Sequence, residues 1–212
     1  MPGQIERTTR RPYESALRRQ QAAATRAQIA AAARRCFAAQ GWTATRVRDV
    51  AAEAGVAEAT VYATYGTKAG LALALVDAAE ASADVVGSVD EMRAMTGDPT
   101  AQLAALVSSD CRLFDTGGDV IVVLREAGPS EPELRAAYEE GRARGDRLHR
   151  DVFNSWPADT FQEGANPDLA TDTYAALCNI DVYRVLTVER AWTAKAVERW
   201  WTQSLGLLLL RS

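Results

Sequence analysis

Hydrophobic and polar positions follow a helical period along most of the chain, and the clearest case lies between residues 45 and 65. Apolar residues there keep the i, i+3, i+4, i+7 spacing that gives a helix one apolar face: Val47, Val50, Ala51 and Ala54. Thr45 stands before this run as a predicted helix cap, and Gly55 follows it, where glycine tolerates a left-handed backbone. A second short helix is predicted over residues 57–65. Two short helices around a glycine-containing turn form a helix-turn-helix arrangement.

The same period predicts further helices on both sides of this hairpin. We expect a helix over 22–40, another over 68–86, and a third from Pro99 to about residue 116. Gly117-Gly118 is interpreted as a turn before a short helical segment, and Ser130 with Glu133 as a capping box that opens the next helix. Helices over 167–190 and from a Thr193 cap to about 210 complete the series. The pattern predicts an all-α fold of about nine helices.

Charge divides the chain into a basic N-terminal part and an acidic remainder. Residues 1–70 hold 11 Lys and Arg against 5 Asp and Glu, whereas residues 71–212 hold 13 against 23, so the net charges are +6 and −10. We expect a disordered basic arm over 1–20, a helix-turn-helix domain over 21–67, and a helical domain over 68–212. The arm either reaches a DNA minor groove or is a solvated tail, and its arginines are Arg7, Arg10, Arg11, Arg18 and Arg19.

Composition narrows the class of protein. Hydrophobic residues make up 48% and charged residues 25% of the chain, which is ordinary for a globular protein, and no apolar run is long enough to predict a membrane helix or a secretory signal. The three cysteines are far apart, so buried reduced thiols and a cytoplasmic location are expected. No spacing predicts a metal site, a cofactor or a catalytic group, and His149 on a charged helix is expected to be solvated.

The stretch GVAEATVYATYGTKAGL resembles the signature of the TetR family, Gly-Val-x-x-x-Thr-hydrophobic-Tyr-x-x-aromatic-x-x-Lys-x-x-Leu. The matching positions are Gly55, Val56, Thr60, Val61, Tyr62, Tyr65, Lys68 and Leu71. The resemblance implies a three-helix DNA-binding head followed by a helical body that dimerises and binds a small molecule. It also implies a transcriptional regulator that is not an enzyme.

The resemblance implies phosphate contacts from Thr45, Tyr62 and Lys68. Helix N-termini favour anions, and a tyrosine hydroxyl can donate to a phosphate oxygen, although packing or capping alone would explain the same residues. Thr60, Ala63 and Thr64 are the candidates for contacts with base edges.

The sequence also departs from the family pattern. Ala57 and Glu58 stand at the start of the second helix, and Ala63 occupies a position that is often basic, so the helix has no Lys or Arg to contact guanine. Arg46 and Arg48, or the N-terminal arm, would compensate.

The last two predicted helices have more apolar surface than one chain would cover, which favours a homodimer. The segment DVYRVLTVERAWTAKAVERWWTQSL resembles the C-terminal helix pair that forms the dimer interface in this family. The expected interface residues are Val182, Val185, Val197, Trp200, Trp201, Leu205 and Leu208. A large core within a single chain is the alternative.

Asp110 interrupts the apolar face of the helix after Pro99, and a buried carboxylate needs a partner. One interpretation is an effector pocket, walled by Leu103, Val107 and Phe114 and with Tyr138 and Trp156 nearby. The other is that Asp110 pairs with Arg125 or Arg184, or lies exposed at a helix edge.

The function expected from the sequence is a DNA-binding transcriptional repressor, released from its double-stranded operator by an unidentified small molecule. The alternative is an all-helical enzyme or small-molecule-binding protein with a nonfunctional DNA-binding head.

Overall fold

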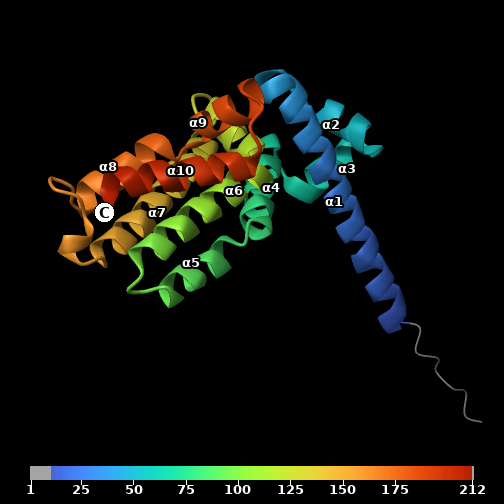
Figure 1. Cartoon of the computed structure of the whole chain (residues 1–212). Helices are drawn as coiled ribbons and strands as arrows, with labels where there is room; N and C mark the ends of the chain where they lie inside the picture. The colour runs from blue at the N-terminus through green and yellow to red at the C-terminus, as the bar shows by residue number, and fades with distance from the viewer. Residues whose placement is uncertain (1–10, 212) are drawn as a thin grey trace, which may run out of the picture. The chain divides into compact units, whose positions relative to one another are not determined.

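The computed structural model describes residues 11–211, and these residues form two compact units that divide between Leu71 and Ala72 (Figure 1). Across this range the structure contains ten α-helices and no extended strand, only a single bridge between Phe161 and Leu210. The expected all-α fold is confirmed. No described helix is both long and apolar enough to cross a membrane.

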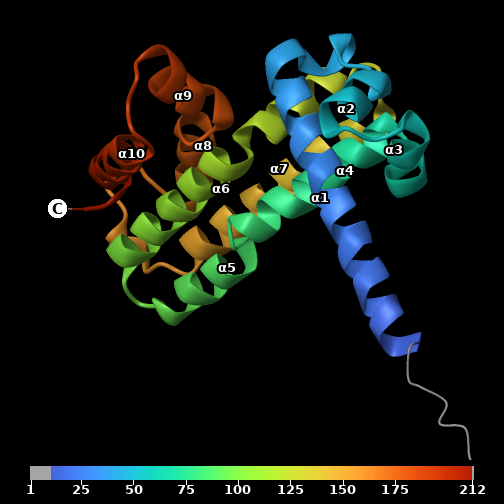
Figure 2. The ribbon, with the colours of Figure 1, turned by 90° about the vertical axis from the view of Figure 1, so that its right-hand side faces the viewer.

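The first unit is a three-helix head made of α1 (Arg11–Ala44), α2 (Val47–Ala54) and α3 (Glu58–Tyr65). α2 packs against the C-terminal half of α1, and α3 packs against α2, while the first half of α1 extends beyond both (Figure 2). One apolar cluster holds the head together, because the faces predicted for α1 and α2 are buried. Its members include Ile29, Ala33, Phe37, Val47, Val50, Ala54 and Val61.

The start of α1 corrects the expectation of a disordered arm over residues 1–20. The helix already begins at Arg11, so Arg18 and Arg19 lie on an exposed helical surface. Alanines and long polar side chains between residues 16 and 28 are good helix formers, which explains how the helix continues without a buried stripe there. Arg7 and Arg10 lie outside the described residues. At its other end α1 is broken by Gly41, whose φ is 71°.

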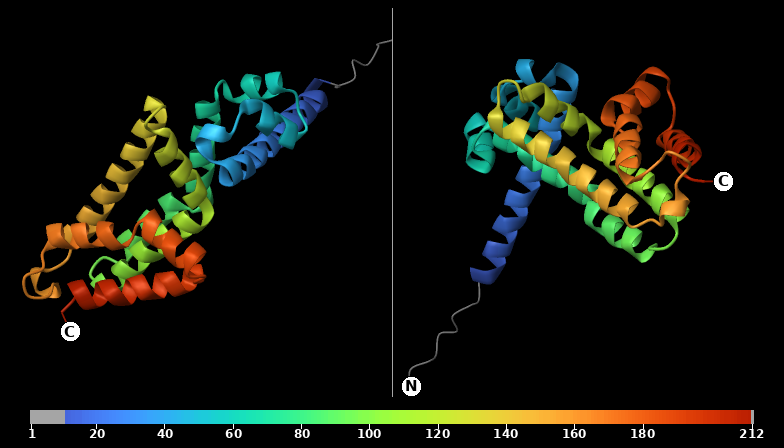
Figure 3. Two further views of the ribbon diagram at one scale, coloured as in Figure 1. Left: turned by 90° about the horizontal axis from the view of Figure 1, so that it is seen from above. Right: turned by 90° about the vertical axis from the view of Figure 1, so that its left-hand side faces the viewer.

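The body consists of helices that pack around α6 (Pro99–Ala127). α6 contacts α5, α7, α9 and α10, and α8 lies against α7 and α10 (Figure 3). Their bounds, after α4 (Lys68–Ser82), are α5 (Val85–Ala94), α7 (Pro132–Asn154), α8 (Pro167–Leu177), α9 (Ile180–Arg184) and α10 (Ala194–Leu209). A short 3-10 helix (Ala158–Thr160) and a π-helical turn (Val185–Glu189) complete the connections.

Two expected helices end earlier than the sequence predicted. The helix expected over 68–86 ends at Ser82, because Asp84 adopts a left-handed backbone with φ of 50° and its side chain accepts the Gly87 N–H at 3.2 Å to start α5. The helix expected over 167–190 breaks at Cys178, and the Asn179 side chain caps α9 by accepting two backbone N–H groups at 3.1 Å. Side-chain caps of this kind restart a helix where its direction changes.

The region from 98 to 134 differs in two further ways. Gly117 and Gly118 do not form a turn, because α6 runs through them and they are buried where other helices approach closely. The predicted capping box at Ser130 is also absent: α7 starts at Pro132 after Glu131, and the Ser130 hydroxyl donates to the Ala127 carbonyl instead. The caps predicted at Asp98 and Thr193 are confirmed, since each accepts a first-turn N–H.

Candidate DNA-binding face and effector site

The helix-turn-helix is shaped by backbone caps at the ends of its short helices. The Arg46 N–H donates to the Asp49 carboxylate at 3.0 Å where α2 begins. Gly55, with φ of 65°, ends α2, and the N–H groups of Gly55 and the next residue donate back to Ala52 and Ala51. Only glycine adopts this left-handed conformation without strain. The turn therefore sets the direction of α3.

α3 presents one face to its own unit and one to solvent. Val61 is buried against the head, whereas Tyr62 is 47% exposed and Ala63 is exposed beside it. Thr60 and Thr64 are half-buried, and the Thr64 hydroxyl donates to the Thr60 carbonyl at 2.7 Å. The structure thus brings the predicted base-contact residues onto one accessible surface.

Thr45 does not have the role that the sequence predicted. Its side chain is only 1% exposed, and its hydroxyl donates to the carbonyls of Gly41 at 2.8 Å and Cys36 at 3.2 Å. Gly41 breaks α1 and leaves these carbonyls without helical partners, and Thr45 satisfies them. The hydroxyl is therefore turned away from any phosphate, and Arg46, not Thr45, is the cap residue of α2.

Lys68 lies at the start of α4, but its ammonium is directed into the head. It donates to the Trp42 carbonyl and lies 3.9 Å from the centroid of the Trp42 ring. The N-terminus of α4 is capped by Thr67, whose hydroxyl accepts the Gly70 N–H at 2.8 Å. Trp42 is a packing residue, as expected from the sequence, and it stacks on Phe37.

Two other contacts in the head were not anticipated from the sequence. Tyr65 donates its hydroxyl to the Arg26 carbonyl at 2.8 Å, and the Arg26 guanidinium lies over the Tyr65 ring. Arg35 and Glu53 form an ion pair at 2.7 Å that links α1 to α2. Contacts between residues this far apart in sequence leave no periodic signal.

Arg46 and Arg48 lie exposed at the N-terminal end of α2, where the sequence analysis expected cations that could replace a basic residue on α3. The Arg48 guanidinium is 3.7 Å from the Asp49 carboxylate, a distance that leaves the ion pair weak and open to solvent.

In the body, Asp110 finds partners that the sequence did not suggest. Tyr174 donates its hydroxyl to Asp110 Oδ2 at 2.9 Å, and His149 Nε2 lies 3.5 Å from the same oxygen. Arg125 pairs with Asp181 instead, and no described ion pair joins Arg184 to Asp110. The arginine alternative is therefore wrong.

His149 is likewise not solvated, because the residue is only 8% exposed and its ring lies 4.2 Å from the ring of Tyr174.

The other predicted pocket residues lie in the core or apart from Asp110. Leu103 and Val107 are buried, and Phe114 is half-buried. Trp156 packs against aromatic neighbours and donates its indole N–H to Gln102 at 2.8 Å, so it is a core residue with a satisfied polar group. Tyr138 is half-buried on α7, and no described hydrogen bond or ring contact joins it to Asp110.

Burial and nearby negative charge act on the titratable groups around Asp110. Burial raises the pKa of Tyr174 well above its usual value, and the Asp110 carboxylate raises it further. Burial also raises the pKa of the Cys111 thiol to about 12, with Glu198, Asp110 and Asp115 adding to the effect. All three cysteines are free and buried, as expected. These phenol and thiol groups are therefore neutral at ordinary pH.

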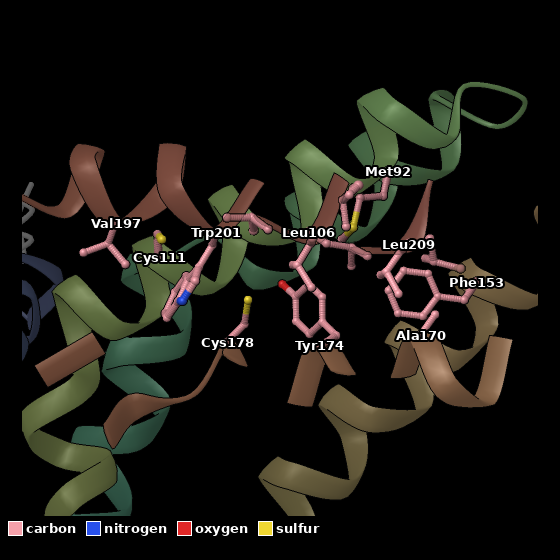
Figure 4. Packing of buried hydrophobic residues seen from close by; sticks show 14 of the residues in the cluster. Met92, Leu106, Cys111, Phe153, Ala170, Tyr174, Cys178, Val197, Trp201 and Leu209 are labelled. Carbon is pink, nitrogen blue, oxygen red and sulfur yellow. The ribbon is translucent and has the colours of Figure 1, made fainter. Parts of the chain in front are cut away.

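Three of the seven expected interface residues are wrong for that role. Val197, Trp201 and Leu205 are 0% exposed within the single chain and belong to its core (Figure 4). One apolar face of α10 looks inward, so the helical spacing did not distinguish core from interface. Trp200 and Val182 are half-buried, while Val185 and Leu208 are exposed. The exposed apolar residues that the sequence analysis missed here are Val188, Trp192 and Leu207.

Comparison with known proteins adds a family to this geometry. Residues 29–75 match the model of the bacterial regulatory proteins of the tetR family. No curated protein matches the chain at a significant level.

Several solved structures share the fold. A transcriptional regulator from Saccharomonospora viridis in complex with choline has a TM-score of 0.67 at 19% identity, covering 90% of this chain and 100% of its own. The fatty acid degradation regulator FadR from Bacillus halodurans has a TM-score of 0.62 at 19% identity, with coverages of 85% and 94%. The ketosteroid regulator KstR2 of Mycobacterium tuberculosis has a TM-score of 0.65 at 16% identity, with coverages of 88% and 95%. With the family's sequence pattern in the head and its fold along the chain, this protein belongs to the TetR family of transcriptional regulators.

Proposed function

We propose that the protein represses transcription by binding an operator through α3 and the N-terminal end of α2, and that a small molecule bound in the body releases it. The observation that carries this proposal is the accessible face of α3, backed by buried Val61, within the segment that matches the family. A rigid short helix with one free face is what major-groove recognition requires.

The chemistry of this face supports a division of labour between α2 and α3. Arg46 and Arg48 are exposed cations suited to phosphates, and the exposed Tyr62 side chain carries a hydroxyl that can donate to a phosphate oxygen. α3 has no Lys or Arg for guanine, so Ala63 and Thr64 would read bases through methyl contacts with thymine. We therefore expect A·T pairs beneath α3.

A dimer is part of the same proposal, because operators are read as symmetric half-sites. The exposed apolar face, which we define as Val185, Val188, Trp192, Trp200, Leu207 and Leu208, supports it. Trp192 and Trp200 contact each other edge to face at 6.0 Å between ring centroids. Exposed large apolar side chains that gather on neighbouring elements favour a partner surface.

The effector is proposed to act by stabilising a body conformation that does not suit DNA. Linkage requires that DNA and effector weaken each other's binding by the same factor. Among proteins with this fold, the Saccharomonospora viridis regulator binds choline, which shows that the architecture accommodates a small organic molecule.

Selection of duplexes from a random library, followed by fluorescence anisotropy, tests the DNA-binding proposal even though the operator sequence is not given. We expect enrichment of a palindromic sequence. Ala63→Asp, which places a negative charge on the α3 face, should abolish binding to it. Val86→Asp on exposed α5 is the matched control and should bind like the parent. Equal binding by both variants would exclude α3 as the contact surface.

A further inference from the structure

Asp110 is a carboxylate with one oxygen engaged and one oxygen free. The Tyr174 hydroxyl and His149 Nε2 both approach Oδ2, at 2.9 Å and 3.5 Å. Among the described residues no donor reaches Oδ1, and 20% of the Asp110 side chain is exposed. The free oxygen is therefore an acceptor that a small molecule could reach.

The charge of Asp110 is not balanced by a Lys or Arg among the described residues. Cationic side chains on the surrounding helices bind elsewhere: Arg125 pairs with Asp181, and Arg112 donates to Ser88 and Ser108. Only the His149 imidazole is close, and it carries charge only when protonated. An uncompensated carboxylate in a partly buried place favours a cation.

Aromatic rings surround this carboxylate. Tyr174 contacts it directly, and Phe114 lies one helical turn further along α6, on the same side. The Phe114 ring is 5.7 Å from the ring of Tyr183 and 6.2 Å from that of Trp201. The faces of aromatic rings attract organic cations, so the rings and the carboxylate act in the same direction.

Two buried polar atoms near this carboxylate lack hydrogen-bond partners, namely His149 Nδ1 and Trp201 Nε1. Buried polar groups are nearly always bonded, so each points to a partner that the chain itself does not supply. Figure 4 shows the Trp201 indole nitrogen directed toward the part of the core that holds Cys178 and the Tyr174 hydroxyl. The indole N–H is a donor and needs an oxygen acceptor.

We propose that Asp110, Tyr174, His149, Phe114 and Trp201 form a site for a small organic cation, an amine or quaternary ammonium that also carries a hydroxyl oxygen. The cation lies against Asp110 and the rings, and the oxygen accepts the Trp201 indole N–H. This inference rests on the proposed effector function and gives that effector a chemical class. A neutral apolar or an anionic effector would leave the free Asp110 oxygen without a partner.

Calorimetric titration of the full chain with choline and with its neutral carbon isostere, 3,3-dimethylbutan-1-ol, separates charge from shape. We expect choline to bind at least about tenfold more tightly than the isostere, since each pairing of a buried charge contributes more than about 1.4 kcal/mol. Asp110→Asn should lower choline affinity by a similar factor while leaving the isostere unchanged. Equal affinities for the two probes, or no choline binding at millimolar concentration, would overturn the proposal.

Two further variants guard against misfolding and indirect effects. Phe114→Leu keeps apolar bulk but removes a ring, and it should reduce the preference for choline over the isostere several-fold. Asp168→Asn, which removes a highly exposed carboxylate on α8, should leave both affinities unchanged. A choline preference that survives both Asp110→Asn and Phe114→Leu would place the cation elsewhere.

DNA affinity of the unmodified protein, measured without any probe, distinguishes this inference from the proposed function. Specific DNA binding without choline binding would overturn only the cation site. Choline binding without specific DNA binding would support the site and contradict the repressor proposal.

Discussion

At the scale of single residues, sequence identified which positions matter in the head better than what their side chains do. The face of α3 was predicted because one helix's periodicity places Val61 inward and Tyr62 outward. The roles of Thr45 and Lys68 depend on which carbonyls the break at Gly41 leaves open, and no local pattern records that. Asp110 was recognised from its place in an apolar stripe, but its partners come from α7 and α8, far along the chain.

Lys68→Met tests whether the ammonium serves DNA as well as Trp42. Methionine keeps the apolar stem, so the variant loses the carbonyl hydrogen bond and the cation–π contact, and we expect about 1 kcal/mol lower stability. If the ammonium also contacts phosphate, the slope of log affinity against log salt should become shallower by about one unit. Urea unfolding and anisotropy at several salt concentrations measure the two effects. An unchanged slope would assign Lys68 to the head alone.

The thiols should be inert in the native protein. Since burial raises the pKa of Cys111 to about 12, roughly one thiol in ten thousand is ionised at pH 8. Reaction with a disulfide reagent should be slow until urea exposes Cys36, Cys111 and Cys178. The unfolded thiol ionises near its ordinary value of 9.0, so this stabilisation is complete below pH 9 and is lost as pH rises toward 12. Fast labelling of the native chain would contradict the burial.

At the scale of elements, the helices were predicted better than their ends. Long apolar periods announce a helix, but the breaks at Asp84 and Cys178 follow from side-chain caps at Asp84 and Asn179 that could equally have stood inside a helix. The opposite error occurred at Gly117 and Gly118, where glycine was interpreted as a turn. In the structure these residues admit neighbouring helices: a Cβ on Gly117 would lie 2.6 Å from Ala79 Cβ, and one on Gly118 2.7 Å from Ile180 Cδ1.

Alanine substitutions at these two glycines should therefore differ. Gly117→Ala forces two helix backbones apart, because the Ala79 Cβ cannot rotate away, and should cost about 1–3 kcal/mol. Gly118→Ala meets only the flexible end of Ile180, and the gain of about 0.5–1 kcal/mol in helix propensity offsets part of the clash. Urea unfolding of both variants provides the comparison. Greater destabilisation by Gly118→Ala would show that the packing of α6 is misassigned.

At the scale of the whole molecule, the basic N-terminal part and the acidic remainder anticipated the division into two units. Sequence could not tell the core from an interface on α10, since both demand large apolar residues at helical spacing. The structure separates Trp201, at 0% exposure, from Leu207, at 76%. Only the exposed members of the stripe remain available to a second copy.

Dimerisation through the exposed apolar face is tested by Trp200→Glu combined with Leu207→Glu. Placing two carboxylates in an apolar contact should dissociate the dimer, because neither charge would find a partner there. Sedimentation velocity measures the result, and Val86→Glu, which changes an exposed apolar residue on α5, serves as control. A double variant that sediments as the parent does would move the interface to another surface.

The central claim is sequence-specific DNA binding by the head, and paired affinities test it most directly. The affinity for the selected duplex and for a scrambled duplex of the same composition should be measured at two salt concentrations. We predict that the selected duplex binds about a thousandfold or more tightly at physiological salt, and that both affinities fall as salt rises. Equal affinity for the two duplexes would contradict the account.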